Sequence, residues 1–184
     1  ESGVACIDIG SGSTSISIFV DGSIVFAKSI NIGAWYISSD ISKVLSTPFD
    51  QAEAIKTFYG SALRGPNDGE EIFSTPLMGG DSNERLSLSK SRLISIIQPR
   101  FYEILMHTKK YIEQSGYNDI AKRNTVITGG GSELIGSVEF SEKYGTNSLN
   151  AISFSLVNPY AWLAPHTAAG PSTPTVVANP AALS

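Results

Sequence analysis

The segment CIDIGSGSTSISIFV, residues 6–20, decides how the chain begins to fold. An apolar run ends at Asp8, a turn of glycine, serine and threonine follows, and a second run then alternates apolar and polar residues. This alternation predicts a strand over 14–20. The apolar run before the turn extends over 4–9 and predicts another strand. After residue 20, an Asp-Gly turn leads into a third run over 23–32. Together these features predict a three-stranded antiparallel meander.

The turn inside this segment has the composition of a phosphate-binding loop. Glycines let the backbone approach an anion closely, and turn amides can point at phosphate oxygens. A carboxylate at the end of a strand, such as Asp8, can hold the water shell of Mg²⁺. No Gly-Lys-Ser/Thr closes the turn and no helix follows it, which excludes a Walker A loop and a Rossmann fingerprint. An ordinary Gly/Ser hairpin fits the residues equally well, because short glycine motifs are common.

Composition limits the class of protein. The 184 residues are 41% hydrophobic and 16% charged, which indicates one packed domain, or one domain with an insert. The net charge of −4, without basic tracts longer than two residues, argues against nucleic-acid binding. A single cysteine excludes an internal disulfide and fits a reducing compartment. No apolar run approaches the roughly 20 residues of a membrane span.

The remaining sequence alternates between helical and strand-like patterns. Pro99 lies within the longest helical pattern and either kinks that helix or marks its true start. After Gly145 the sequence becomes rich in proline, and its pattern predicts no element. The predicted elements, in order, are helices over 35–46 and from Pro48 to about Gly60, short strands within 71–80 and 85–89, a helix over 91–115, a strand over 125–128 and a helix over 132–143.

Two further stretches are candidates for ligand binding. The glycines 129–131 lie between a predicted strand and helix, where a flat ligand can lie against backbone, although Ser132 is equally suited to a plain helix N-cap. Glu53 and Lys56 are spaced i, i+3 on one helix face. They form either a polar clamp for a ribose or base, or an ordinary surface ion pair.

The order of these stretches resembles the C-terminal half of FtsA, the actin-like family of bacterial cell-division proteins. An Asp-Gly-x-Gly hairpin, a helix with Glu-x-x-Lys and a strand-Gly-Gly-Gly-helix follow one another as in the second nucleotide-binding lobe of actin-like ATPases. The resemblance covers residues 3–145 and is weaker in the tail. The strings that carry it are VACIDIGSGSTSISIFVDGSIVFAKSINIGA (4–34), SSDISKVLSTPFDQAEAIKTFYGSA (38–62), IIQPRFYEIL (96–105) and VITGGGSELIG (126–136).

The resemblance implies an α/β fold, one lobe of the actin-like ATPase (ribonuclease H-like) fold. A mixed sheet with helices would carry a small inserted α+β subdomain. Residues 1–62 and 122–184 would form subdomain 2A, and residues 63–121 the inserted subdomain 2B.

The resemblance also implies a set of binding residues for ATP and for a protein partner. Arg100 would face the C-terminal tail of FtsZ, since an arginine can grip a carboxylate with two hydrogen bonds. Alternatively, Arg100 is a surface charge that covers apolar area on its helix. The ATP contacts would be made by Asp8 (through water to Mg²⁺), Gly10, Ser11, Gly12, Ser13 and Thr14 at the phosphates, Glu53 and Lys56 at the ribose side, and Gly129, Gly130 and Gly131 at the adenine.

In function, the resemblance implies a part of an actin-like protein that anchors FtsZ at the division septum and assembles into protofilaments. We expect it in the cytoplasm at the inner face of the cell membrane, with membrane contact only through a segment that this sequence lacks. The resemblance begins at the second lobe, so we expect at most weak ATPase activity, and only in the intact two-lobed protein. The alternatives are a lobe of another actin-fold ATPase, of the chaperone or rod-shape type, or an inactive remnant of such a gene.

Overall fold

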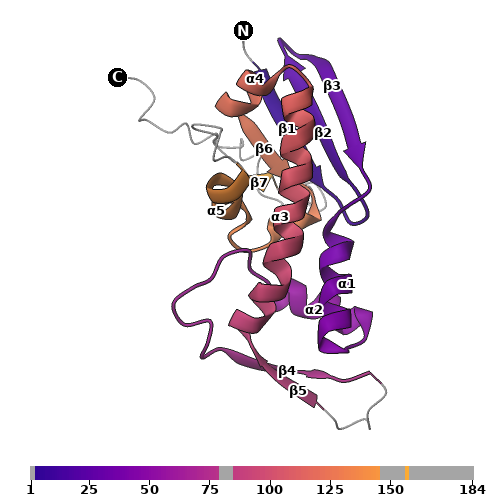
Figure 1. Ribbon diagram of the computed structural model, residues 1–184, viewed down its shortest axis with the longest axis vertical. Coiled ribbons are helices and arrows are strands. Elements are labelled where there is room, and N and C mark those ends of the chain that lie inside the picture. The colour runs from indigo at the N-terminus through magenta and orange to yellow at the C-terminus, as the bar shows by residue number, and fades with distance from the viewer. Residues whose placement is uncertain (1–2, 79–84, 146–155, 158–184) are drawn as a thin grey trace, which may run out of the picture.

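The computed structural model describes residues 3–78, 85–145 and 156–157, and a mixed sheet forms its centre (Figure 1). The sheet has five strands in the order β3-β2-β1-β6-β7. Strands β1, β2 and β3 are antiparallel neighbours, whereas β6 runs parallel to β1 and β7 parallel to β6. The predicted meander and mixed sheet are therefore confirmed. The strands are β1 (Gly3–Ile9), β2 (Thr14–Val20), β3 (Ser23–Ile30), β6 (Thr125–Thr128) and β7 (Leu156–Val157).

The turn between β2 and β3 forms because of its Asp-Gly pair. Asp21 has a φ of 48° and Gly22 a φ of 80°, both in the left-handed region. Two consecutive residues of this kind match the right-handed twist of the flanking strands. Asparagine, aspartate and glycine tolerate this region best, so these two residues fix the hairpin.

Among the described residues, four α-helices are longer than four residues. In Figure 1, α3 lies across one face of the sheet and extends from the β4–β5 hairpin to α4. Pro99 lies inside α3, so it does not mark the start of this helix. The helix begins at Lys90 instead, where the Ser89 hydroxyl accepts a hydrogen bond from the amide of Arg92. The bounds are α1 (Ala34–Leu45), α2 (Phe49–Tyr59), α3 (Lys90–Gln114) and α4 (Asn118–Arg123), with β4 (Ile72–Pro76) and β5 (Arg85–Ser89) in the hairpin.

The helix predicted over 132–143 is wrong as a single element. The chain instead forms a 3₁₀ turn, η1 (Gly130–Glu133), then the short helix α5 (Ser137–Phe140) and a π turn, η2 (Ser141–Gly145). Gly136 separates them with a φ of 73°, a left-handed conformation that cannot continue a right-handed helix. Ser132 is also no helix cap, because its hydroxyl donates to the carbonyl of Gly129 at 2.7 Å.

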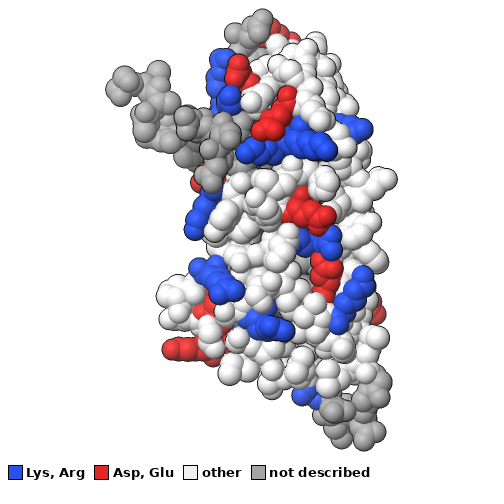
Figure 2. Space-filling model, in the orientation of Figure 1, with Lys and Arg blue, Asp and Glu red and all other residues white. Residues whose placement is uncertain are grey.

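The charged side chains on the face seen in Figure 2 are mixed in sign. Lys and Arg lie next to Asp and Glu over much of this face, without a large area of one sign. Such a surface does not concentrate counterions of one kind over an extended patch.

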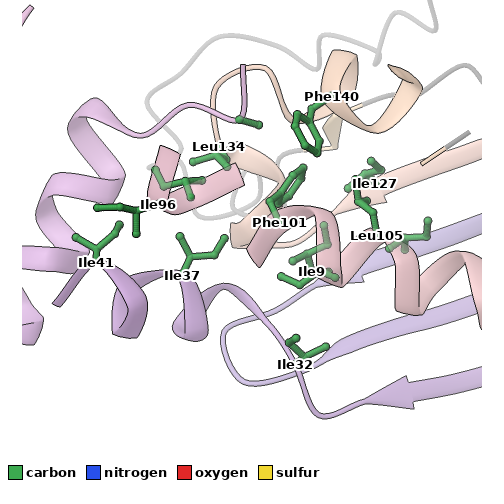
Figure 3. Packing of buried hydrophobic residues seen from close by; sticks show 14 of the residues in the cluster. Ile9, Ile32, Ile37, Ile41, Ile96, Phe101, Leu105, Ile127, Leu134 and Phe140 are labelled. Carbon is green, nitrogen blue, oxygen red and sulfur yellow. The ribbon is translucent and has the colours of Figure 1, made fainter. Parts of the chain in front are cut away.

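The hydrophobic core lies between the sheet, α1 and α3 (Figure 3). Ile9 and Ile127 extend from the sheet toward Phe101 of α3, and all three are fully buried. Ile37 of α1 lies in the same cluster. The ring of Phe101 meets that of Phe140 edge-to-face at 5.6 Å between centroids. Burial of this cluster packs α1 and α3 against the sheet.

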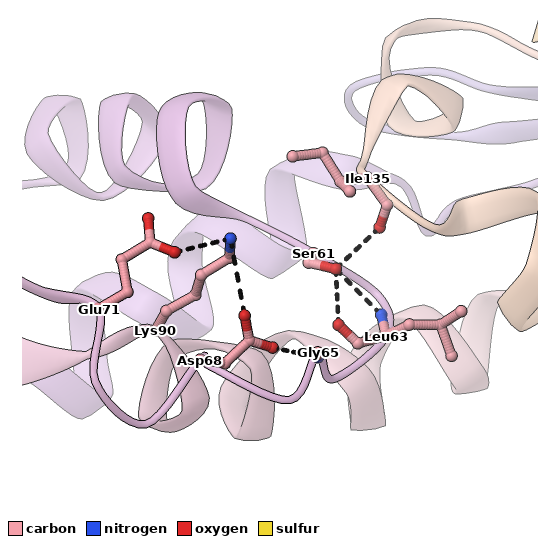
Figure 4. A network of polar contacts seen from close by, with 7 residues as sticks. All are labelled: Ser61, Leu63, Gly65, Asp68, Glu71, Lys90 and Ile135. Carbon is pink, nitrogen blue, oxygen red and sulfur yellow. Dashed lines mark hydrogen bonds and ion pairs between the residues drawn. The ribbon is translucent and has the colours of Figure 1, made fainter.

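A polar network ties the segment after α2 to the rest of the protein (Figure 4). The Ser61 hydroxyl lies 2.7 Å from the carbonyl of Leu63 and 3.1 Å from that of Ile135. Further along, the Asp68 carboxylate accepts from the Gly65 amide and lies 3.7 Å from Nζ of Lys90. The segment is thereby held at both ends. The division into subdomains 2A and 2B stays a prediction, and most of the tail after Gly145 lies outside the described residues.

Candidate functional site

A cavity of about 510 Å³ opens where the three candidate stretches of the sequence meet. This volume falls within the range of small-molecule sites, roughly 300–1,000 Å³. The cavity lies at the end of β1 and brings together the turn after that strand, α2 and the glycines after β6. Its lining residues are Asp8, Gly10, Ser11, Ala34, Ile37, Glu53, Lys56, Thr57, Gly60, Gly129, Gly130, Gly131, Glu133 and Leu134.

Eight of the predicted nucleotide residues line this cavity, and three others do not. The three are Gly12, Ser13 and Thr14, which belong to the same turn. Thr14 is fully buried, and its hydroxyl donates to the carbonyl of Ile32 at 2.8 Å. The Thr14 side chain therefore holds the loop after β3 and does not face the cavity. Toward a nucleotide, the roles of all these residues stay predictions.

The three glycines after β6 differ in what surrounds them. A Cβ on Gly129 would lie 2.3 Å from Oδ1 of Asp8, and one on Gly131 would lie 2.3 Å from Cγ2 of Ile9. A Cβ on Gly130 would meet nothing within 4 Å. Gly129 and Gly131 therefore let this segment pack directly on the end of β1. Gly130 leaves open backbone beside the cavity, which fits a flat ligand.

The turn after β1 is closed by one of its own backbone hydrogen bonds, and its role as a phosphate loop stays a prediction. The amide of Gly10 donates to the carbonyl of Ser13 at 2.9 Å, which closes the turn. Asp8 is exposed at the end of β1, at the edge of the cavity. Within the described ranges, no three His, Cys, Asp or Glu residues gather into a metal-binding group. Any Mg²⁺ at Asp8 would therefore complete its coordination with water and ligand oxygens.

Glu53 and Lys56 form a clamp between α2 and the start of α1. Lys56 Nζ lies 2.9 Å from Oε1 of Glu53 and 3.3 Å from the carbonyl of Ala34. Ser38 of α1 donates a hydrogen bond to Oε2 of the same glutamate. Partial burial acts to raise the pKa of Glu53, but the hydrogen bonds from Ser38 and Lys56 outweigh it, so the pKa is lowered. At neutral pH the clamp thus holds a carboxylate facing the cavity.

Several lining residues were not found from the sequence. Ala34 and Ile37 come from α1, and Glu133 and Leu134 from η1. Ala34, Glu133 and Leu134 lie within the strings that carry the family resemblance but were not chosen as binding residues, whereas Ile37 is brought to the cavity by the packing of α1. Thr57 could have been found, because it lies four residues after Glu53 on the same face of α2.

Arg100, the predicted partner-binding residue, is not among the residues that line the cavity. Its Nε donates to Oδ2 of Asp40 at 2.7 Å and its Nη2 to Oδ1 at 3.1 Å, while Nη1 donates to Glu103 at 2.5 Å. The hydrogen bond with Asp40 raises the pKa of Arg100, and it outweighs partial burial, which acts to lower that pKa. The guanidinium also lies over the ring of Tyr36. Arg100 thus connects α3 to α1 in this structure.

Comparison with known proteins identifies a family. The family model described as cell division protein FtsA matches residues 5–181, past Gly145, where we expected the likeness to weaken. The cell division protein FtsA of Rhizobium meliloti is 35% identical over 144 residues, which are 78% of this chain and 33% of that protein. The chain therefore spans about a third of the length of the curated relatives that it matches.

Solved structures show the fold. MreB5 of Spiroplasma citri bound to AMPPNP superposes with a TM-score of 0.67 at 20% identity, covering 83% of this chain and 48% of that one. The MamK double helical filament gives a TM-score of 0.61 at 16% identity, with 83% and 49% covered. These are actin-fold proteins, so the predicted actin-like α/β fold is confirmed.

In the part of the chain described here, none of the helices has the length and apolar character to span a bilayer.

Proposed function

Because the chain belongs to the FtsA family of cell division proteins, we propose that it is the second nucleotide-binding lobe of an actin-like protein that anchors FtsZ at the septum. The observation that carries this proposal is the cavity of about 510 Å³ shared by the turn after β1, the Glu53–Lys56 clamp and the triple glycine. The three stretches are distant in sequence and converge on one site. An actin-like relative with a nucleotide bound, MreB5, supports the same reading.

The cavity residues fit ATP with Mg²⁺. Ser11 would present its turn amide to the phosphates, and Gly10, whose own amide is bonded within the turn, would let the backbone approach them closely. Asp8 would hold Mg²⁺ through water, the Glu53–Lys56 clamp would bind the ribose, and Gly130 would lie under the adenine. When bound, ATP would supply a polyanion and its metal, which link these elements through one ligand. The residues of this chain would bind and orient the nucleotide, and any hydrolysis would belong to the intact protein.

A pair of glycine variants tests nucleotide binding. Gly130 and Gly69 are both exposed, and at both an added Cβ meets nothing within 4 Å. Only Gly130 lines the cavity. Gly130→Val should reduce ATP affinity at least about tenfold, since it places a side chain where the adenine would lie, whereas Gly69→Val should leave affinity unchanged. Calorimetric titration of the full chain gives both values, and equal affinities for both variants would contradict the proposal.

The second part of the proposal concerns the FtsZ tail, an acidic peptide, and Arg100. This arginine already contacts two carboxylates, those of Asp40 and Glu103. A peptide carboxylate would compete with them, so Asp40→Asn should strengthen peptide binding and Arg100→Glu should abolish it. Fluorescence anisotropy with a labelled FtsZ C-terminal peptide measures both effects. No binding by the wild-type chain would refute this part.

Self-association and location complete the proposal. The likeness to a MamK filament supports assembly into actin-like protofilaments by the intact protein. Its site of action would be the inner face of the cell membrane at the division site. Sedimentation of the intact protein with and without ATP tests the assembly, and a supernatant fraction independent of ATP and of concentration would contradict it.

A further inference from the structure

Helix α1 begins directly against the turn after β1. The amide of Ala34 donates to the carbonyl of Gly10 at 2.9 Å, and the amide of Trp35 donates to that of Ser11 at 2.8 Å. A Cβ on Gly33 would lie 2.4 Å from the Ser11 oxygen and 2.5 Å from the Gly10 oxygen. Only a glycine permits this approach, so the start of α1 is fixed to the turn that would hold phosphate.

The same helix also contacts the clamp. Ser38, one turn after the start of α1, is fully buried and donates its hydroxyl hydrogen to Oε2 of Glu53. Lys56 Nζ donates to the carbonyl of Ala34 at 3.3 Å. One rigid helix therefore meets the phosphate turn at its first residues and the clamp one turn later. The distance between the two subsites is set by α1.

We propose that Ser38 is a positioning residue that orients the Glu53 carboxylate toward the ribose hydroxyls of a bound nucleotide. The inference rests on the proposed nucleotide site. A carboxylate has about four lone-pair positions, and the hydrogen bonds from Ser38 and Lys56 leave others for further donors. The two hydroxyls of a ribose are donors of this kind.

The need for such a residue follows from exposure. The Glu53 side chain is 47% exposed, whereas that of Lys56 is 13% exposed. A half-exposed glutamate on a helix surface loses rotamer freedom when it binds a ligand, and that loss weakens binding. Ser38, a buried residue of α1, fixes the position of the Glu53 carboxylate before the ligand binds.

Ribose discrimination tests the inference. Calorimetric titration of the full chain would compare ATP with 2′,3′-dideoxy-ATP, which lacks both hydroxyl donors. The wild type should prefer ATP by about tenfold or more, as expected for hydrogen bonds to a charged group. Ser38→Ala should weaken ATP binding while leaving dideoxy-ATP binding unchanged, so that the preference falls toward one. Ser39→Ala, the same change at the next buried position of α1, should retain the preference.

A second variant guards against a folding defect in Ser38→Ala. Ser38→Cys nearly preserves the volume but replaces a strong donor by a weak one, so it should lose most of the preference as well. Equal weakening of both nucleotides by these variants would overturn the inference, because it would show a purely structural role. A wild type that binds both nucleotides equally would overturn it too. A wild type that binds neither would remove the proposed nucleotide site itself.

Discussion

Replacing Gly131 with alanine should destabilise the protein, whereas the same change at the adjacent Gly130 should not. The Cβ of the first variant would lie 2.3 Å from Cγ2 and 3.1 Å from the carbonyl oxygen of Ile9. Ile9 is fully buried, so its side chain cannot move away without disturbing its neighbours. At Gly130 the added methyl meets nothing within 4 Å. Two consecutive glycines thus differ only in what lies against them.

The expected magnitude follows from this contact. Forcing a methyl group into a packed core costs about 1–3 kcal/mol. Replacing glycine by alanine also restricts the unfolded chain, which stabilises by about 0.4–1 kcal/mol at compatible sites, and this gain applies to both variants. The free energy of unfolding should therefore be lower for Gly131→Ala than for Gly130→Ala by about 1–3 kcal/mol. In a chain of this size each kcal/mol shifts the melting temperature by about 2–4 °C.

The assay is urea unfolding of the two variants and the wild type, followed by far-ultraviolet circular dichroism at equal protein concentration. A double variant provides the control, because Ile9→Ala removes Cγ2 and should remove most of the added cost at Gly131. Indistinguishable midpoints for the two alanine variants would refute the reasoning. So would a cost at Gly131 that is unchanged in the Ile9→Ala background.

Three further predictions concern α1, α2 and α3. Phe101→Ala should lower the free energy of unfolding by about 3–5 kcal/mol, whereas Tyr102→Ala, at a position 43% exposed, should cost far less in the same urea assay. A double-mutant cycle on Arg100 and Asp40 should give a coupling of about 0.5–3 kcal/mol, and zero coupling would contradict the bridge. The pKa of Glu53 in the folded state is below 4.5, so its carboxylate contributes stability above pH 4.5. This stability is lost as the pH falls through the pKa of the folded state. Glu53→Gln should therefore show a smaller loss of stability on acidification, measured as urea midpoints at pH 3–6.

The strands of the meander could be predicted because their determinants are local. The alternation in β2 marks one buried face, and the Asp-Gly pair fixes the turn into β3. The order of the three candidate stretches along the chain could likewise be recognised in the sequence.

The break at Gly136 could not be predicted from hydrophobic periodicity. Gly136 adopts a left-handed conformation, and a Cβ added to it would lie 3.2 Å from Cβ of Leu63. Leu63 is far away in sequence, so its contact with Gly136 could not be predicted from local patterns.

Thr14 shows a second limit of sequence reasoning. Its type suits a phosphate contact, but the first position of β2 is paired with both Ile9 and Ile30, at the centre of the antiparallel meander. Its side chain lies on the buried face with Ile16, where the carbonyl of Ile32 satisfies its hydroxyl. The strand register, rather than residue type, decides on which face a side chain lies.

Arg100 illustrates how a distant residue changes the meaning of a local one. In sequence it is a lone arginine on a helix, suited to grip an acidic peptide. Asp40, 60 residues earlier, accepts two of its hydrogen bonds. Three of its five N–H donors are already bonded to Asp40 and Glu103, so an incoming carboxylate competes with these contacts for the guanidinium. The affinity of this surface for an acidic ligand therefore depends on Asp40 as much as on Arg100 itself.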